Sequence, residues 1–109
     1  MDKDQDYLNL LRKIKKNPNY SQRKLAGELG FSLGKLNYCL SALKLKGLIK
    51  IKNFKKNPNK INYFYVLTPK GIAKKASLTI NFMKRKMKEY DELQNEIKND
   101  GLKNAIKKK

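Results

Sequence analysis

The sequence predicts a mainly helical fold with one small β-hairpin, and three patterns along the chain support this expectation. Four segments repeat apolar residues at spacings of three and four, which is the period of one helix face. Residues 48–54 alternate apolar and polar side chains, and residues 61–67 are rich in aromatic and β-branched side chains, as strands are. The sequence Asn-Pro-Asn between them favours a turn, so the two strands are expected to pair.

The first three helices carry their own start and stop signals. They are expected over residues 4–16, 22–29 and 33–46. Ser21 and Ser32 stand where N-caps are needed, and Gly30 can adopt the left-handed conformation that closes the second helix. The expected buried residues are Tyr7, Leu8, Leu11 and Ile14, then Leu25, Ala26 and Leu29, then Leu36, Cys39, Leu40 and Leu43. A short helix that turns through Phe31 into a longer one is the helix-turn-helix pattern.

The hairpin follows this pair of helices directly, and a long helix follows the hairpin. Thr68 and Pro69 form a strong helix start, and helical spacing of apolar residues continues to about Lys98. This order predicts a winged helix-turn-helix domain. Its expected parts are a DNA-binding domain over residues 4–67, a long C-terminal dimerisation helix over residues 68–98 and a frayed basic tail over residues 99–109.

Positive charge dominates the chain and is unevenly placed. Lysine and arginine total 27 and the acids total 9, which gives a net charge of +18. No acid lies between Leu29 and Lys88, although fifteen basic residues do. Such a tract favours an acidic partner, with nucleic acid first and an anionic membrane second. A generally lysine-rich composition without functional meaning is the alternative.

The residues that the chain lacks limit its chemistry. It has no histidine and a single cysteine, so we expect no metal site, no disulfide and no histidine-based catalysis. No nucleophile–base pair or Gly-rich phosphate loop is present, so an enzyme is not expected, and neither is a cofactor. The N-terminus has no signal peptide and no window is apolar enough for a membrane span, so we expect a cytoplasmic protein that does not enter membranes.

A winged helix-turn-helix places its second motif helix in the major groove, which assigns roles to the polar residues. The predicted base-reading residues of this helix are Ser32, Gly34, Lys35, Asn37, Tyr38 and Ser41. The predicted phosphate contacts are Ser21, Gln22, Arg23 and Lys44. The predicted wing contacts are Lys52, Asn53, Lys55, Lys56, Asn57 and Lys60. For each of these, the alternative is an ordinary solvated surface position.

The last helix is longer than a domain of this size requires. Its predicted seam consists of Ile80, Met83, Met87, Tyr90 and Ile97. A helix of roughly 30 residues spans about 45 Å, so we expect this seam to bury against a second copy rather than against its own domain. Two copies related by a two-fold axis would read a palindromic site. Cys39 could serve as a redox switch, but a small core residue is the favoured interpretation.

Several stretches resemble small MarR-like regulators associated with exopolysaccharide loci. The resemblance covers residues 7–97, and residues 32–40 are its most specific part. The other stretches that carry it are residues 21–26, 52–54, 67–73 and 82–87. It implies a bacterial transcriptional regulator encoded near genes for surface polysaccharides. Larger members of the wider family hold a ligand between N- and C-terminal helices, and this sequence shows no such pocket-lining cluster, so a small-molecule effector is not expected.

The leading hypothesis is therefore a homodimer that binds specific double-stranded DNA and regulates transcription. Two alternatives remain open at the level of sequence. One is a protein-interaction adaptor built on the same fold, in which the charge is incidental. The other is an RNA-binding module, because Tyr63, Phe64 and Tyr65 could offer an aromatic stacking surface on a strand.

Overall fold

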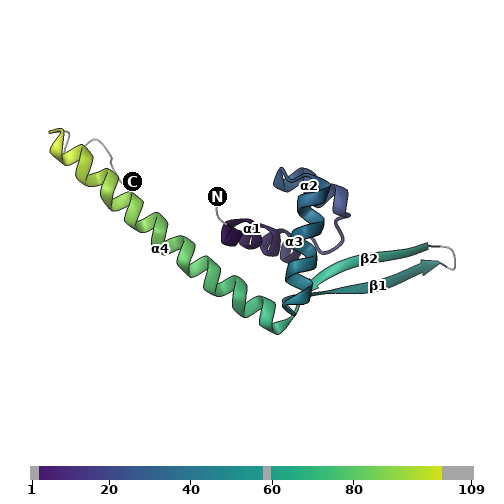
Figure 1. The fold of residues 1–109 in the computed structure, drawn as a ribbon. Coiled ribbons are helices and arrows are strands. Elements are labelled where there is room, and N and C mark those ends of the chain that lie inside the picture. Colours follow the sequence, from purple (N-terminus) through teal and green to yellow (C-terminus); the bar gives the residue numbers. More distant parts are fainter. Residues whose placement is uncertain (1–2, 58–59, 102–109) are drawn as a thin grey trace. The chain divides into compact units, whose positions relative to one another are not determined.

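A computed structural model describes residues 3–57 and 60–101 of the chain, and the side chains of residues 53–63 lie outside this description. The elements occur in the order α1 (Lys3–Lys16), α2 (Gln22–Leu29), α3 (Leu33–Leu45), β1 (Ile49–Asn57), β2 (Lys60–Leu67) and α4 (Pro69–Asn99) (Figure 1). This confirms the predicted fold class, a mainly helical winged helix-turn-helix with a long C-terminal helix.

The chain divides into two compact units, Met1–Leu78 and Thr79–Lys109. The core of the first unit lies where α1 packs against α2, α3 and β2. The predicted buried faces of α1 and α3 are confirmed, and α1 buries Leu10 in addition because its apolar stripe is wider than predicted. Leu29, which is expected in the core, is only half-buried, and so is Phe31 at the turn between the motif helices. The side chains that the core buries most completely are Leu8, Leu10, Leu11, Ile14, Leu25, Leu36, Leu43 and Ile49.

The ends of α2 and α3 are fixed by the caps that the sequence predicts. The Ser21 hydroxyl accepts a hydrogen bond of 3.1 Å from the Lys24 amide, and the Ser32 hydroxyl accepts one of 3.0 Å from the Lys35 amide. Gly30 has a φ of 72°, and its left-handed backbone turns the chain from α2 into α3. The turn thus sets the crossing of the two motif helices.

The hairpin is longer than predicted. Its antiparallel strands pair from Ile49 with Leu67 out to Asn57 with Lys60, with an irregularity near the tip. The first predicted strand ends at residue 54, three residues before the end of β1, and the second begins at residue 61, one residue after the start of β2, because the polar sequence near the tip favours a turn. Antiparallel pairing satisfies backbone amides and carbonyls whatever the side chains are, so it extends into this polar segment. The tip itself, residues 58–59, lies outside the described residues.

A corner of hydrogen bonds joins the start of α4 to the end of α3. The Thr68 hydroxyl donates to the Gly47 carbonyl at 2.6 Å and accepts from the Gly71 amide at 3.0 Å. The Thr68 amide also donates to the Leu48 carbonyl. Thr68 is therefore both the predicted N-cap and a clamp that fixes where α4 begins.

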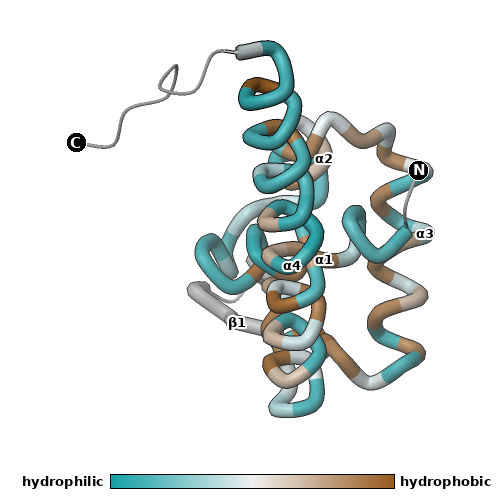
Figure 2. Tube along the Cα trace, turned by 90° about the vertical axis from the view of Figure 1, so that its left-hand side faces the viewer, coloured by the Kyte–Doolittle hydropathy of each residue, from teal (hydrophilic) through white to brown (hydrophobic). Residues whose placement is uncertain are grey.

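Within α4, apolar residues recur along a helix that is otherwise strongly polar (Figure 2). Only Gly71 and Leu78 are buried among its described residues, and both belong to the first unit. The basic tail is predicted over residues 99–109. Asn99 is instead the last residue of α4, and residues 102–109 lie outside the described residues.

Candidate nucleic-acid interface

The N-terminus of α2 is held against the hairpin by a hydrogen bond. The Gln22 side-chain amide donates to the hydroxyl of Tyr65 on β2 at 2.7 Å, and the Tyr65 ring is buried. The first backbone hydrogen bond inside this helix runs from the Leu25 amide to the Ser21 carbonyl. The amides of Gln22 and Arg23 precede that bond and lie at the positive end of the helix dipole, where a phosphate group is stabilised.

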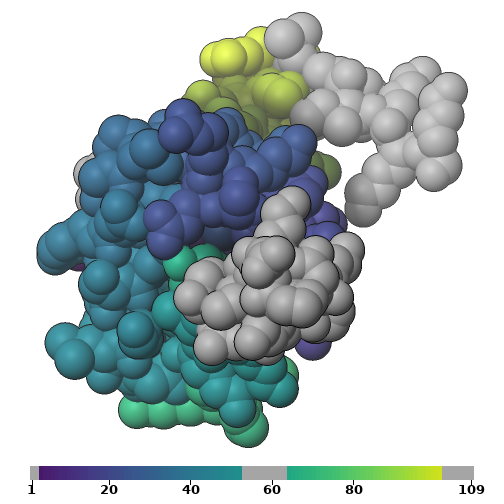
Figure 3. All heavy atoms as spheres, turned by 90° about the vertical axis from the view of Figure 1, so that its right-hand side faces the viewer, coloured from purple at the N-terminus to yellow at the C-terminus, as the bar shows by residue number. Residues whose placement is uncertain are grey.

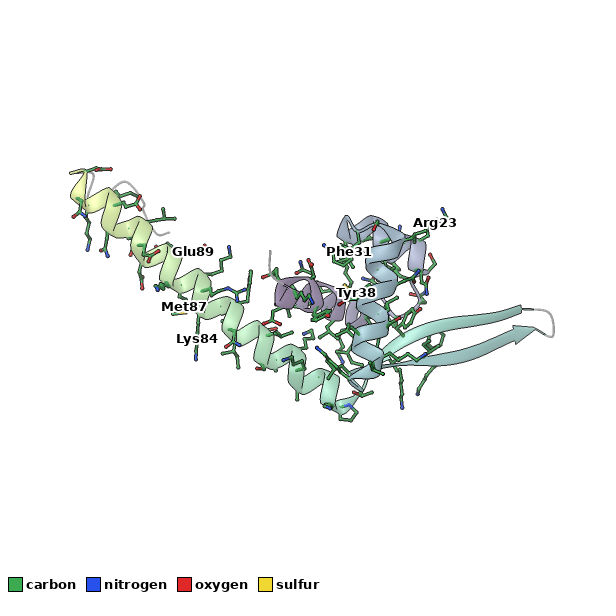
Figure 4. All side chains as sticks on the ribbon, viewed as in Figure 1. Arg23, Phe31, Tyr38, Lys84, Met87 and Glu89 are labelled. Carbon is green, nitrogen blue, oxygen red and sulfur yellow. The ribbon has the colours of Figure 1, made fainter. Side chains whose placement is uncertain are left out.

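Arg23 extends from the same end of α2 into solvent (Figure 4). Neighbouring Lys24, which is not among the contact residues predicted from the sequence, is also exposed, and its ammonium lies 5.4 Å from the centre of the Tyr20 ring. The N-terminus of α2 therefore offers two long cationic side chains beside two amides. This is the chemistry that a phosphate contact needs.

The exposed side of α3 carries four of the predicted contact residues on one stripe. Gly34, Asn37, Ser41 and Lys44 follow one another at spacings of three and four, and all four are exposed. We call these four residues the recognition face. A Cβ atom added at Gly34 would meet only the Ser32 hydroxyl oxygen, at 4.0 Å, so the backbone of the first turn is open to close approach.

Lys35 and Tyr38 lie on a different flank of α3, the one toward the N-terminal half of α1. The Lys35 ammonium lies 3.1 Å from Asp6 Oδ2 and 4.4 Å from the centre of the Phe31 ring. The Tyr38 ring is 60% exposed, and the Lys3 ammonium lies 5.9 Å from its centre. The structure thus separates the six predicted base-reading residues into the recognition face and this α1-side flank, with Ser32 used as the cap.

The Asp6 carboxylate is a feature that the charge pattern concealed. Residues 29–88 contain no acid in sequence, yet α1 places one against α3. An aspartate in the first turn of a helix is ordinarily explained by the helix dipole, so sequence alone gives no signal of this contact. A base contact by Lys35 stays a prediction. To make it, the Lys35 ammonium would have to leave the Asp6 carboxylate and bind the DNA base instead.

The hairpin adds exposed lysines next to the motif. Lys50 and Lys52 are exposed and, being two residues apart on β1, point to the same face of the strand. Lys50 was not selected from the sequence, although the alternation of the strand could have revealed it. The remaining predicted wing residues are Asn53, Lys55, Lys56, Asn57 and Lys60, and their side chains lie outside the described part of the chain. Figure 3 shows the side of the molecule toward which the hairpin extends in Figure 1, with residues of α2 and α3 next to each other.

Cys39 lies on the buried side of α3 and is 4% exposed. Burial raises the pKa of its thiol, and the carboxylate of Asp6 raises it further, against smaller opposite effects of Lys35 and Lys3. A raised pKa disfavours the reactive thiolate. This environment fits the core role that the sequence favours over a redox switch.

In the second unit, the predicted seam residues of α4 are largely exposed. Ile80, Met83 and Met87 are each more than half exposed, and Tyr90 is 43% exposed, while Ile97 is half-buried. Leu93, which is not part of the predicted seam, is 57% exposed and lies beside these residues on α4. These residues leave an apolar stripe without a partner in the described chain.

The described residues offer no sign of a metal site or a membrane span. Residues 3–57 and 60–101 contain no cluster of three His, Cys, Asp or Glu side chains placed to hold a metal ion. No helix in this part of the chain combines the length and the hydropathy that crossing a bilayer requires.

Known proteins resemble this chain in two respects. A family model matches the sequence of the helix-turn-helix motif, and solved structures share the fold. Residues 8–50 match the family model described as winged helix-turn-helix DNA-binding, a segment that includes both α2 and α3. No curated protein matches the sequence.

Solved structures with a similar fold include MarR-family proteins. A mutant of S. aureus MepR superposes with a TM-score of 0.66 at 20% identity, over 94% of this chain and 72% of that chain. The zinc-responsive MarR family member ZitR of Lactococcus lactis gives a TM-score of 0.61 at 18% identity, over 94% and 67% of the two chains. FabT of Streptococcus pneumoniae in complex with DNA gives 0.57 at 22% identity, over 94% and 70%. The chain therefore has the winged helix-turn-helix fold seen in MarR-family structures.

Proposed function

We propose that this protein binds specific sequences of double-stranded DNA and regulates transcription, and that it acts as a homodimer on a palindromic site. The observation that carries the proposal is the recognition face of α3, beside which the hydrogen bond between Gln22 and Tyr65 fixes the N-terminus of α2. FabT, a structure of similar fold, is described in complex with DNA, which supports the same partner here.

Each member of the recognition face has a matching chemistry on DNA. The Asn37 amide can bond adenine N6 and N7 in a bidentate manner, and the Ser41 hydroxyl can donate to a base edge. Gly34 permits the helix backbone to approach the groove closely, while the Lys44 ammonium reaches a phosphate. We propose that Arg23 and the α2 amides hold the adjoining phosphates and that Lys52 and the rest of the wing follow the backbone.

The homodimer part of the proposal rests on the apolar stripe of α4. Ile80, Met83 and Met87 are exposed side chains that a second copy would remove from water. A dimer brings two recognition faces to one duplex, which lengthens the sequence read and raises specificity. We further propose surface-polysaccharide genes as targets, on the strength of the resemblance carried by residues 32–40.

Selection of bound sequences from a random duplex pool tests the DNA-binding proposal directly. We expect an enriched palindrome, and we expect its affinity to fall with salt at a slope of about −0.9 in log–log units per phosphate neutralised. Failure to enrich any duplex, or equal enrichment of duplex RNA, would exclude sequence-specific DNA binding. Occurrence of the enriched palindrome upstream of polysaccharide genes would test the proposed targets.

Two variants separate base reading from phosphate contact. Asn37→Ala should relax the preference at one base position and cost about 1–3 kcal/mol on the selected site. Lys44→Ala should weaken all duplexes nearly equally and reduce the salt slope by about one phosphate. Lys16→Ala, which removes an exposed lysine at the end of α1, is the matched control and should do neither.

A further inference from the structure

The apolar stripe on the second half of α4 has an internal symmetry. The predicted seam residues Ile80, Met83, Met87, Tyr90 and Ile97, with Gln94 at the one interrupted position of the seam, alternate steps of three and four residues as the a and d positions of a coiled coil do. These six positions are placed symmetrically about the point between Lys88 and Glu89. When the direction of the helix is reversed about this point, each position falls on another of the six. Ile80 then corresponds to Ile97, Met83 to Gln94 and Met87 to Tyr90.

The charges of the same segment invert at the same point. The residues before it carry only positive charges, at Lys84, Arg85, Lys86 and Lys88. The residues after it, up to Ile97, carry only negative charges, at Glu89, Asp91, Glu92 and Glu96. An ion pair of 3.4 Å between Lys86 and Glu89 spans the boundary within the helix.

We propose that two copies of α4 pair side by side in antiparallel orientation, centred between Lys88 and Glu89. This inference rests on the proposed homodimer and specifies its geometry. The two-fold axis would place Ile80 against Ile97 of the other copy, and Met87 against Tyr90. Each basic half would lie along the acidic half of its partner, and the Lys84 ammonium of each copy would lie beside the Asp91 carboxylate of the other.

A parallel pair makes the opposite use of these charges. It would bring the two basic halves together at one end of the pair and the two acidic halves together at the other end. Neighbouring helices in a pair lie 8–10 Å apart, within about one Debye length at physiological salt, so this repulsion is only partly screened. A parallel pair retains one attractive contact, between Lys86 of one copy and Asp91 of the other. Lys84 has no such partner in a parallel pair, so substitutions at Lys84 and Asp91 distinguish the two orientations.

The one polar residue of the seam already has a hydrogen-bond partner in its own helix. The Gln94 amide donates to the Tyr90 hydroxyl at 3.2 Å. In the antiparallel pair Gln94 faces Met83, which needs no hydrogen bond from it. This hydrogen bond within the helix therefore lowers the free-energy cost of burying the Gln94 side-chain amide in the pair.

Disulfide trapping distinguishes an antiparallel from a parallel orientation of the two α4 helices. In a Cys39→Ala background, Ile80→Cys and Ile97→Cys are made as separate variants, and the two are mixed under mild oxidation. The antiparallel pair predicts that the mixed disulfide predominates and that neither variant cross-links with itself. In a parallel pair the two sites lie about 25 Å apart, and each variant would instead cross-link with itself.

A charge-swap cycle provides a second measurement that introduces no cysteine. Lys84→Asp and Asp91→Lys should each weaken dimerisation in sedimentation by about tenfold, because like charges then face each other, and the double variant should restore it. If Lys84→Asp has no effect and the double variant is not rescued, the pair is parallel and the inference is wrong. A wild-type chain that stays monomeric while still selecting a DNA sequence would overturn this inference and the dimer but leave DNA binding intact.

Discussion

The Lys35 ammonium of α3 and the Asp6 carboxylate of α1 lie 3.1 Å apart, next to the helix that we propose enters the DNA groove. Lys35 is partly exposed and Asp6 is mostly covered, so the carboxylate holds the lysine along the flank of α3. This carboxylate would also repel a phosphate approaching from that side. The contact thus restrains a cation that could otherwise reach DNA.

Replacing Asp6 should therefore strengthen DNA binding. We expect Asp6→Asn to tighten binding to the selected duplex by a few fold at low salt, since a partly exposed ion pair contributes about 0–1 kcal/mol. The gain should shrink as salt rises. Fluorescence anisotropy titrations at several salt concentrations measure both effects.

The ion pair between Lys13 and Glu28 is a matched control, because it also has a length of 3.1 Å but does not involve α3. Glu28→Gln should leave the affinity nearly unchanged. Equal gains in the two variants would mean that net charge alone is responsible, and a loss with Asp6→Asn would mean that the contact positions Lys35 for binding.

The hydrogen bond between Gln22 and Tyr65 gives a second prediction. Tyr65→Phe keeps the buried ring and deletes the hydroxyl that accepts from the Gln22 amide. Because one hydrogen bond contributes about 1 kcal/mol, we expect DNA affinity to fall roughly fivefold as the α2 terminus loses its anchor on β2. The thermal unfolding temperature, measured in parallel, should change by only a few degrees. Tyr20→Phe, which keeps the ring beneath Lys24, serves as the control and should bind normally.

The elements and the core of the motif followed from local signals in the sequence. Ser21, Ser32 and Gly30 act within one turn of the chain, so the residue types themselves reveal the caps and the tight turn. The spacing of Leu36, Leu40 and Leu43 likewise fixed which side of α3 is buried. Periodicity and capping chemistry are local, and this is why they could be predicted.

The division of α3 into two flanks could not be predicted in the same way. Whether Lys35 reaches solvent or Asp6 depends on how α1 packs across α3, which no local pattern encodes. The hydrogen bond from Gln22 to Tyr65 likewise joins residues that are distant in the chain. The candidate DNA-binding residues were thus selected by type and spacing, and the packing of other elements determined their neighbours.

Stability at alkaline pH should depend on Cys39. Burial raises the pKa of its thiol above the ordinary value of 9.0, so the folded state retains a proton that the unfolded chain releases. The contribution of the buried thiol is therefore complete below pH 9 and declines as pH rises toward the folded pKa. Urea unfolding from pH 7 to about pH 10 should show Cys39→Ala less stable than wild type at neutral pH, with a difference that narrows above pH 9. A constant difference across this range would show that the thiol ionises alike in both states.

Among the glycines of the chain, Gly71 is the one at which an added side chain would meet backbone atoms. It is buried at the start of α4, and a Cβ atom there would collide with the carbonyl oxygen of Leu48, the group that accepts from the Thr68 amide. Backbone atoms cannot rotate away as a flexible side chain can, so Gly71→Ala should displace α4 from the corner and destabilise the first unit by about 1–3 kcal/mol.

Gly27→Ala is the matched control, because Gly27 is exposed within α2 and a Cβ there meets nothing within 4 Å. This control should instead raise stability by about 0.4–1 kcal/mol through better helix propensity. Thermal unfolding of the two variants therefore gives shifts of opposite sign, and a Gly71→Ala variant at least as stable as wild type would show that the corner at Gly71 can rearrange without cost.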